Sequence, residues 1–426
     1  MHAKAKGAPK FRFYALYDKI YRKDVIAVAY RQCAANGGAP GIDGITFKAI
    51  EGYGVERWLG ELSEVLKTKK YRPSAVRRVF IPKPDGKKRP LGIPTIMDRV
   101  VQTAAMLILG PIFEADLPPE QYAYRPNRSA LDAIRHVHAL LTSGHVQVVD
   151  ADLSGYFDSI PHGELMKSLA RRICDGALLH LLALWLKAPV VETDDRGGQH
   201  VSTPQKNAGR GTPQGAPISP LLANLYMRRF ILGWAQLGYG DRLRARIVNY
   251  ADDFVICCRN TGSAAMEIMR RLMQRLRLTV NETKTKCVDA WEESFDFLGY
   301  RIGPCYSAKT GKRYLGTRPS PKSMQALRSK IQTITRRSTT CLTIAVTVER
   351  LNCLLRGWAN YFCLGPIWKA YRAVDGYVSE RLRHWLCLQR KVRSRTRSRT
   401  PCDELHAKYG LVKLQAVARS HPWAKA

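Results

Sequence analysis

Apolar residues follow two different periods along this chain, and each period predicts a type of element. The runs VQVVDADL and IVNYADDFVICC are short and rich in β-branched and aromatic residues, which predicts strands. AAMEIMRRLMQRLRL and ELSEVLKTKK place apolar residues three and four apart, the spacing of an amphipathic helix. RRVFIP predicts a further strand before the turn PDGKK, and DRVVQTAAMLIL predicts a long helix.

The order of these elements divides the chain into regions. Residues 1–60 are mixed and basic and end in the turn-rich GGAPGIDGITF, and residues 61–145 run from helix to strand to turn to helix. Residues 146–303 alternate short strands with helices, which predicts an α+β domain. From Thr317 onward the pattern is helical and heavily basic, which predicts a separate all-α module.

The charge of the chain indicates its partner. Its 426 residues include 69 Lys and Arg against 35 Asp and Glu, a formal net charge of +34. On a chain with 45% hydrophobic residues, this excess is typical of a globular protein whose partner carries many phosphates, with an anionic membrane as the rival. We find no run of about 18 apolar residues and no secretion signal in MHAKAKGAPKFRF, and therefore expect a soluble intracellular protein without a membrane partner.

Eleven cysteines raise the question of zinc or disulfides. Cys257 and Cys258 adjoin on a predicted strand, the others are scattered, and no CxxC pair occurs, so we expect buried thiols in a reducing compartment and no zinc. After Cys387 only Cys402 and two histidines remain, too few ligands for a terminal zinc nuclease module.

Four aspartates stand out because they adjoin apolar strand patterns. Asp150 and Asp152 lie near the end of VQVVDADL. Since the side chains of a strand alternate between its faces, we expect these two to share a face. By the same rule Asp252 should lie with Tyr250, and Asp253 should face away.

Close packing of such carboxylates predicts bound cations. The economical arrangement brings Asp152 against Asp252, where two buried negative charges would repel each other severely. Mg²⁺ prefers hard oxygen ligands, and two such ions activate a 3′ hydroxyl and stabilise a leaving pyrophosphate. We therefore expect a site for two Mg²⁺ ions. The alternative is that these acids are turn residues or solvated surface charges.

Eight blocks of sequence support the first interpretation by their order. They are RRVFIPKPDGKKRPLGIPTIMDRVVQ (77–102), YAYRPNRSALDAI (122–134), VVDADLSGYFDSI (148–160), GRGTPQGAPISPLLANLYM (209–227), NYADDFVI (249–256), NETKTK (281–286), FDFLGYRI (295–302) and RGWANYF (356–362). In these blocks the chain resembles the reverse transcriptase and maturase encoded by bacterial group II introns, without the terminal HNH endonuclease domain. Its departures, YAYRP, TIMDRVVQ and the Thr283 of NETKTK, affect the subclass rather than the catalytic residues.

The resemblance implies a fold. It is a right-hand polymerase of the α+β class, with fingers over 61–145 and a palm over 146–303 that holds an antiparallel sheet and inserted finger elements. An all-α thumb and maturase (X) domain would follow over 304–400. Residues 1–60 would then be an N-terminal extension and residues 401–426 a short C-terminal tail.

The resemblance also implies the metal ligands. Asp152 and Asp252 match the principal ligands of two Mg²⁺ ions. The backbone carbonyl of Leu153 would add a further oxygen ligand. Asp253 would bind the metal more weakly or would support the ligands without touching it. Asp152, Asp252 and Asp253 are thus the implied catalytic residues.

Five residues match the binding site of the incoming nucleotide. Phe157 matches the aromatic residue that carries the sugar, where its bulk would exclude a 2′ hydroxyl; the alternative is a core aromatic. Lys83 and Arg89 match cations that grip the triphosphate, although a solvated basic hairpin has the same composition. Gln214 and Gly215 match the segment beneath the base and sugar, in what could otherwise be only a loop.

The basic C-terminal region is the expected site of RNA binding. Arg and Lys recur there at helical spacing with interleaved Trp and Tyr, a pattern suited to phosphates and unpaired bases. The expected contacts are Arg356, Trp358, Tyr361, Arg393, Arg395, Arg397 and Arg399. Core packing is an equal alternative for Trp358 and Tyr361, and a solvated tail is the alternative for the arginine run.

These observations lead to one functional hypothesis and two rivals. We expect an RNA-directed DNA polymerase that binds its intron RNA, an RNA template, a DNA primer and deoxynucleoside triphosphates in the bacterial cytoplasm near the nucleoid, and that assists splicing. The first rival is a splicing cofactor without significant polymerase activity. The second is a free-standing relative used in DNA repair or defence. Intact catalytic acids favour the first hypothesis.

Overall fold

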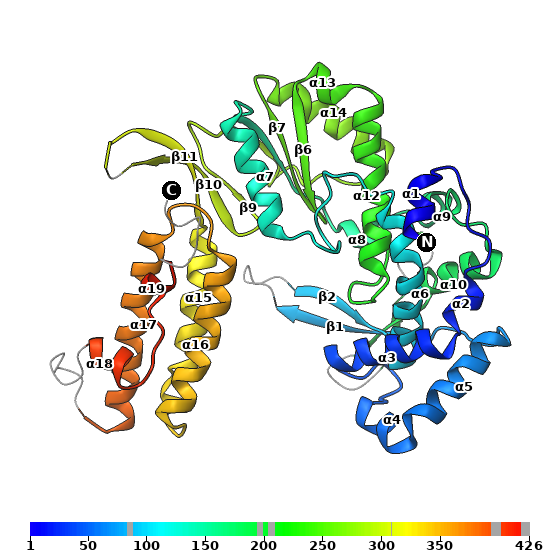
Figure 1. The fold of residues 1–426 in the computed structure, drawn as a ribbon, viewed down its shortest axis with the longest axis horizontal. Helices are drawn as coiled ribbons and strands as arrows, with labels where there is room; N and C mark the ends of the chain where they lie inside the picture. The colour runs from blue at the N-terminus through cyan, green and yellow to red at the C-terminus, as the bar shows by residue number, and fades with distance from the viewer. Residues whose placement is uncertain (83–87, 194–198, 203–208, 308, 393–401, 419–426) are drawn as a thin grey trace.

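The computed structural model shows the palm between the fingers and a helical thumb. Helices α15 to α17 stand at one side in Figure 1, and the β1–β2 hairpin extends from the body toward them. This arrangement is the right-hand form that was expected. The described residues are 1–82, 88–193, 199–202, 209–307, 309–392 and 402–418.

The first 60 residues belong to the fingers rather than to a separate extension. Ile20, Ile26 and Ala29 are fully buried in the same core as Val100 and Val101 of helix α6. A boundary after residue 60 would also cut through a helix, so this predicted division was wrong. The helices here are α1 (His2–Gly7), α2 (Tyr17–Ile20), α3 (Lys23–Asn36), α4 (Phe47–Tyr53), α5 (Val55–Lys67) and α6 (Ile96–Glu114).

Helix α6 forms the axis of this core. By length and composition it is apolar enough to cross a membrane, contrary to the expectation that no such run exists. In the fold, however, 61% of this apolar stretch is buried. Its first turn carries Asp98, which accepts hydrogen bonds from the hydroxyls of Tyr71 at 2.5 Å and Thr95 at 2.8 Å. These properties are those of the core helix of a folded domain.

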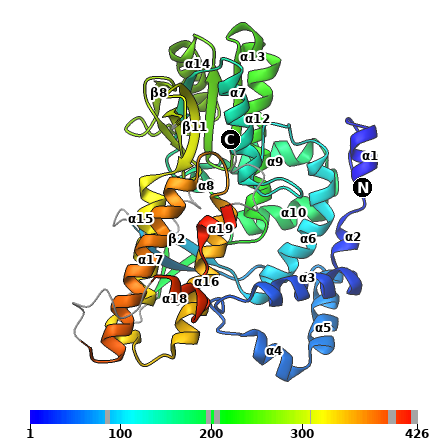
Figure 2. The ribbon, with the colours of Figure 1, turned by 60° about the vertical axis from the view of Figure 1, so that its left-hand side comes forward.

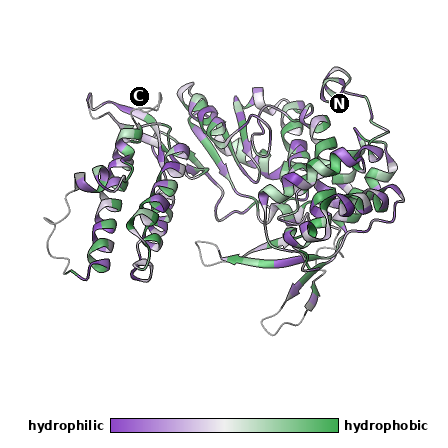
Figure 3. Cartoon of the chain, turned by 60° about the horizontal axis from the view of Figure 1, so that its bottom comes forward, coloured by the Kyte–Doolittle hydropathy of each residue, from purple (hydrophilic) through white to green (hydrophobic). Residues whose placement is uncertain are grey.

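The finger sheet is assembled from two distant regions of the chain. Its strands, in the order β2-β1-β4-β5, are β2 (Lys88–Ile93), β1 (Val76–Pro82), β4 (Val190–Thr193) and β5 (Gln199–Ser202). Strand β1 is antiparallel to β2 and parallel to β4. Its outer half exposes Val79, Phe80 and Ile81, and Figure 3 shows this apolar strand reaching away from the body.

The palm sheet places one strand at its centre. Its order is β6 (Ala245–Tyr250), β7 (Asp253–Cys258), β3 (Gln147–Ala151) and β8 (Lys286–Asp289). Strand β3 is antiparallel to both neighbours. Val149 and Ala151 belong to the core of the fingers and palm, whereas Val148 belongs to a second core shared with the thumb. This strand is therefore buried on both faces.

Helices cover the two faces of the palm sheet. Helix α7 packs on the face that contains Val148, whereas α12 and α14 pack on the other. The predicted helix in AAMEIMRRLMQRLRL is α14, which is thus confirmed. The helices of this part are α7 (Ala130–Thr142), α8 (Tyr156–Ser159), α9 (His162–Ala170), α10 (Gly176–Leu186), α12 (Ser219–Gln236), α13 (Tyr239–Arg242) and α14 (Gly262–Arg275).

A second, three-stranded sheet connects the palm to the thumb. Thr317 lies in its strand β11, so the helical region begins later than expected, at Pro321. The strands, in the order β11-β10-β9, are β11 (Arg313–Pro319), β10 (Tyr300–Tyr306) and β9 (Phe295–Phe297). The thumb helices are α15 (Pro321–Ile334), the short 3₁₀ helix η1 (Arg337–Thr339), α16 (Ile344–Tyr361) and α17 (Trp368–Gln389).

Residues 402–418, part of the predicted C-terminal tail, pack on the thumb. Leu405 and Leu414, in or beside α18 (Cys402–Ala407) and α19 (Leu414–Ala418), are fully buried in the thumb core. The buried carboxylate of Asp375, on α17, accepts hydrogen bonds from the backbone N–H groups of Leu414 at 2.8 Å and Gln415 at 3.1 Å. It thereby caps α19 from a neighbouring helix. Figure 2 shows α19 lying against α16 and α17.

The cysteines of the described residues form no disulfide. Cys257 and Cys258 are buried in the palm sheet, as expected. Burial was wrong as a general prediction, because Cys174, Cys287 and Cys341 are exposed. Cysteine spacing excludes motifs, but it does not reveal which side of a helix or strand each thiol occupies.

Replacing Asp375 should release the C-terminal segment. Asp375→Ala removes the acceptor for one buried and one partly buried backbone N–H group, and an unsatisfied buried group costs about 1 to 3 kcal/mol. We expect faster amide hydrogen exchange over residues 411–417 and a lower free energy of unfolding. Asp241→Ala is the control, because the Asp241 carboxylate is 91% exposed in its ion pair with Arg246 and should cost less than about 1 kcal/mol. Equal exchange in both variants would contradict this capping role.

Candidate active site

The β6–β7 hairpin presents the two adjacent acids on a two-residue turn. Ala251 and Asp252 form the turn, and Ala251 adopts φ +58°, a left-handed conformation that is costly for a residue with a Cβ. Tyr250 and Asp253 lie directly opposite each other across the hairpin. Opposed residues point to the same face, so Asp253 lies with Tyr250. The predicted faces of Asp252 and Asp253 were wrong, because strand alternation does not continue through a turn.

The end of β3 meets this hairpin. Its last pair with β7 joins Ala151 to Phe254, so one further step brings Asp152 level with Asp253. Asp150, one pair inside the sheet, has its pKa raised to about 7. Burial is the main cause; Lys286 opposes it, and the charges of Asp253 and Asp152 add to it. Three carboxylates therefore lie within electrostatic reach of one another at this edge of the sheet.

The segment NETKTK holds Asp152 in place. The Asp152 carboxylate accepts a hydrogen bond from the Asn281 amide at 2.9 Å and forms an ion pair with the Lys284 ammonium at 3.2 Å. The following residue, Leu153, is fixed by an antiparallel bridge to Val280. These positioning contacts were not predicted, although the segment was one of the eight blocks.

The two hairpin acids act on different neighbours. Burial raises the pKa of Tyr156 well above its ordinary value, and the charge of Asp252 adds to this. On the thumb side, burial raises the pKa of Tyr361 to about 12, and both Tyr250 and Asp253 add to that shift. Asp253 thus lies toward the thumb, while Asp252 influences the palm helix α8.

The predicted nucleotide residues Phe157, Gln214 and Gly215 are brought together at the finger sheet. The Gln214 amide donates to the Asp158 carboxylate at 3.2 Å, and the Phe157 carbonyl accepts a hydrogen bond from the Thr212 N–H at 2.8 Å. Gly215 has φ +111°, and a Cβ there would lie 2.5 Å from the carbonyl oxygen of Gly92. Only glycine fits this close approach to strand β2.

The remaining nucleotide contacts are described only in part. Phe157 is 7% exposed and packs edge-on against Tyr156, with ring centroids 5.7 Å apart. Arg89 pairs with Ile81 in the backbone of the finger hairpin, and Lys83 and the side chain of Arg89 lie outside the described residues. Phe157 is thus a core aromatic, as the alternative predicted, and its role at the sugar stays a prediction.

A cavity beside this loop is lined by the predicted residue Gln214 and by further polar residues that were not predicted. It has a volume of about 40 Å³ and is lined by Arg78, Asp158, Arg210 and Gln214, among others. Arg78 forms an ion pair with Glu192 at 3.0 Å across the parallel β1–β4 pair. The cavity could not be predicted because that strand pairing joins distant parts of the chain.

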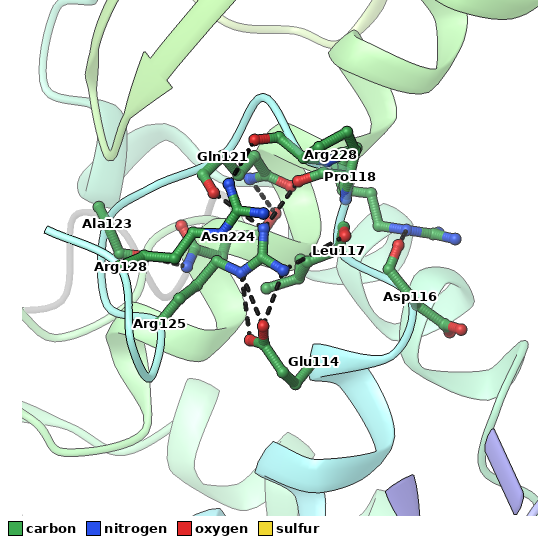
Figure 4. A network of polar contacts seen from close by, with 11 residues as sticks. Glu114, Asp116, Leu117, Pro118, Gln121, Ala123, Arg125, Arg128, Asn224 and Arg228 are labelled. Atoms are coloured by element: carbon green, nitrogen blue, oxygen red, sulfur yellow. Dashed lines mark hydrogen bonds and ion pairs between the residues drawn. The ribbon is translucent and has the colours of Figure 1, made fainter. Parts of the chain in front are cut away.

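The motif YAYRPNRSALDAI has a structural role. The Arg125 guanidinium, 6% exposed, forms an ion pair with Glu114 at 2.7 Å and donates to the carbonyls of Pro118 and Gln121 (Figure 4). This closes the loop between α6 and α7. The adjoining Tyr122 N–H donates to the carbonyl of Asn249 at 2.9 Å, so the loop also supports strand β6 behind the acidic hairpin.

The predicted RNA contacts in the thumb fall into three groups. Arg356 is exposed and remains available to RNA. Trp358 is 9% exposed and packs against Phe362, with centroids 4.9 Å apart, so its indole has no open face for a base and core packing is the correct interpretation. Tyr361 is partly buried and donates a hydrogen bond to the Leu298 carbonyl at 2.8 Å. The run Arg393, Arg395, Arg397 and Arg399 lies outside the described residues.

The Tyr361 contact is part of a clamp on the turn between β9 and β10. This turn has positive φ at Leu298 (+50°) and Gly299 (+79°). The Gly299 carbonyl accepts hydrogen bonds from the Ser320 N–H at 2.9 Å and the Ser323 hydroxyl at 2.8 Å. The start of α15 and the end of α16 therefore both hold this turn beside the acidic hairpin. Leu298 and Gly299 lie in the block FDFLGYRI and Tyr361 lies in RGWANYF, whereas Ser320 and Ser323 lie outside the eight blocks.

Removing the Asp150 charge should stabilise the metal-free protein at high pH. Below about pH 4 the carboxyl is protonated in folded and unfolded chains alike, and Asp150→Asn has no advantage. As the pH rises, the unfolded chain ionises first and the folded chain only near pH 7. Wild type should therefore lose stability relative to Asp150→Asn up to about pH 7, by at most about 4 kcal/mol, and the difference should then stay constant.

Urea unfolding in EDTA at several pH values measures this difference. Asp241→Asn, at the exposed carboxylate on α13, provides the control for a lost surface charge. A stability gap that is independent of pH would show that Asp150 does not carry the predicted penalty.

Comparison with known proteins agrees with this geometry. Residues 81–302 match the family described as reverse transcriptase (RNA-dependent DNA polymerase). Residues 324–402 match the group II intron, maturase-specific domain.

Individual relatives extend the match. Protein YkfC of Escherichia coli K12 is 34% identical over 354 residues, which are 74% of this chain and 90% of that protein. The group II intron-encoded protein LtrA of Lactococcus lactis subsp. cremoris is 34% identical over 224 residues, 52% of this chain but only 35% of LtrA. Telomerase from Candida albicans is similar in structure, with a TM-score of 0.43, 13% identity, and coverage of 78% of this chain and 62% of that one; this TM-score is too low to transfer anything further. From the two family matches and the sequence relatives, the chain belongs to the reverse transcriptase family, among the reverse transcriptases and maturases that group II introns encode.

Proposed function

We propose that this chain copies RNA into DNA, and that it also binds its intron RNA and assists splicing. The observation that carries the polymerase half is the meeting of β3 with the β6–β7 hairpin, where burial raises the pKa of Asp150 and the charges of Asp253 and Asp152 add to that rise. A protein that only bound RNA would gain nothing from such crowding of like charges.

The oxygen donors at this edge suit a divalent metal. Enzymes of this family use divalent metal ions, and we assign two Mg²⁺ to the carboxylates of Asp152, Asp252 and Asp253 and the backbone carbonyl of Leu153. Bound there, the ions would activate the primer 3′ hydroxyl and stabilise the leaving pyrophosphate. In the described part of the chain no three His, Cys, Asp or Glu side chains form a ready-made cage, so nucleotide phosphates would complete the ligand set.

Cationic side chains offset this charge when no nucleotide is bound. Lys284 pairs with Asp152, and Lys286 lies opposite Asp150 in the sheet. Both lysines come from the NETKTK segment. This one short segment therefore orients the Asp152 carboxylate and also reduces the electrostatic repulsion on Asp150. Lys284 is 62% exposed, which leaves its ammonium free to exchange one anionic partner for another.

Substrate selection would follow from the loop beneath the fingers. The ring of Phe157 would meet a ribose 2′ hydroxyl, and Gln214 and Gly215 would support the base and sugar. Lys83 and Arg89, on the finger hairpin, would bind the triphosphate of a deoxynucleotide. RNA template and DNA primer would occupy the space between this hairpin and the thumb.

The thumb would hold the intron RNA through phosphates. Its described helices expose many basic side chains, whose charges attract an RNA backbone without sequence preference. Arg356 belongs to this set, and the arginines from 393 to 399 extend it along the sequence. The exposed basic residues are Lys322, Arg328, Lys330, Arg336, Arg337, Arg350, Arg356, Lys369, Arg372 and Arg390.

The Asp252→Asn variant tests the polymerase half separately from splicing. Extension of a DNA primer on an RNA template with Mg²⁺ should fall by about 100-fold or more, because the metal supplies several kcal/mol of charge stabilisation. Intron RNA binding and splicing should stay near the wild-type level, since only the metal site changes.

Asp241→Asn serves as the control for an aspartate lost elsewhere and should extend normally. Robust extension by Asp252→Asn would overturn the assignment. If wild type supports splicing but extends no primer, the splicing-cofactor alternative is the correct one.

The Phe157→Val variant tests sugar selection. Because the bulk of the ring is the proposed barrier, discrimination against ribonucleotides should fall by about 10-fold or more in relative kcat/KM. Tyr156→Phe is the matched control, since it keeps the neighbouring ring and removes only the hydroxyl that donates to Ala223 at 2.6 Å. An unchanged ratio together with lower stability would mean that Phe157 is core packing alone.

A further inference from the structure

A polar cavity lies on the side of the fingers and palm that faces away from the thumb. Its volume is about 210 Å³, and since liquid water occupies about 30 Å³ per molecule, the cavity has room for several waters or one tetrahedral oxyanion. It opens between the end of α6, the end of α9, α12 and the N-terminal segment at Pro9. Helices α1 and α9 lie on the opposite side of the molecule from α15 to α17 (Figures 1 and 2).

Three arginines and one acid determine the charge of this cavity. Arg171, Arg172 and Arg228 line it together with Asp116. Arg172 is buried, pairs with the Asp116 carboxylate at 3.0 Å, and donates to backbone carbonyls of the N-terminal segment, including those of Ala5 and Phe11. Arg172 therefore has a structural role, and it forms the ion pair with Asp116, the acidic residue that lines the cavity.

Arg228 forms no ion pair of its own with the described residues, although the charge of Asp116 acts on it. Its Nε donates to the backbone carbonyl of Asp116 at 2.7 Å, as Figure 4 shows, and its terminal nitrogens have no hydrogen-bond partner within the described residues. Burial lowers the pKa of Arg228; Asp116 opposes this, and the positive charges of Arg171 and Arg172 add to it. A partly buried guanidinium in a net positive cavity is stabilised by an added anion.

We propose that this cavity binds a phosphate group and that the backbone of the intron RNA supplies it. The planar forks of Arg171 and Arg228 match the oxygens of a phosphate, and Arg172 adds charge behind them. An RNA held here would run along the outer face of the fingers and leave the space under the β1–β2 hairpin open for template and primer. The RNA source rests on the proposed function, whereas the phosphate site does not.

The site is tested on the full-length protein with inorganic phosphate as the probe. At constant ionic strength, replacing chloride by about 20 mM phosphate should raise the wild-type Tm by about 2 to 4 °C, because a ligand that binds only the folded state stabilises it. The double variant Arg171→Gln, Arg228→Gln should lose this rise. The double variant Arg31→Gln, Arg275→Gln, with the same charge change at two exposed arginines outside the cavity, should keep it.

A phosphate-dependent rise that is equal in both double variants would overturn the proposal. Since Arg228 is partly buried, its variant could fail to fold. The single variant Arg171→Gln, at an exposed arginine, then decides: the proposal predicts a smaller rise than in wild type, and an unchanged rise would overturn it.

Filter binding with the intron RNA separates the two sources of phosphate. If the RNA backbone supplies it, the cavity variant should bind about tenfold more weakly than the control variant. Its slope of log K against log salt should flatten by about 0.7 to 0.9. If RNA affinity and slope equal those of the control while the Tm rise is lost, the site stands and free phosphate is its ligand. Primer extension on a short template should be normal in either case, so a failure of the polymerase assignment is seen separately.

Discussion

The burial of strand β3 on both faces is the constraint on which the active site depends. Strands β7 and β8 occupy its edges, and two different cores occupy its faces through Val148 and Val149. A charged side chain inside such a strand would carry a large desolvation penalty, so the acids lie at or near its end. Asp150 marks the limit, because one pair inside the sheet its pKa is already raised to about 7. The β6–β7 hairpin and the NETKTK segment meet at that same end, which makes it the site.

The same constraint explains why a chain of net charge +34 concentrates acids in one place. Positive charge over the surface attracts RNA, but it would also neutralise isolated acids at the surface with its own lysines and arginines. Crowding three carboxylates creates a local demand for positive charge that Lys284 and Lys286 meet only in part, since burial still keeps the pKa of Asp150 high. Small divalent ions meet this demand better than an ammonium on a flexible chain. Within a basic protein, this acidic edge therefore has the ligand chemistry that a divalent ion prefers.

Sequence patterns predicted the elements of this site but not every side chain in it. Strand β3 and helix α14 could be predicted from local periodicity, because the buried apolar residues of each recur at the spacing of that element. The pairing of β1 with β4 does not, since it joins distant segments that no local signal links. Asp252 was placed wrongly because alternation was applied across Ala251, where a positive φ turns the chain. Leu414 looked like a tail residue because its partner for burial, the face of α17 that carries Asp375, lies elsewhere in the sequence.

The polymerase and the maturase module share one core, and this limits how independent their functions can be. Val148 and Val255 of the palm lie in the same apolar cluster as Leu351 and Tyr371 of the thumb. At its edge, Tyr361 reaches from α16 to the turn at Leu298, beside the acids of the hairpin. A movement of α16 when the thumb binds RNA would therefore act directly on a turn with two positive φ angles, which has few alternative conformations. In this chain Tyr361, which lies within the matched maturase domain, therefore also supports the turn beside the acidic hairpin.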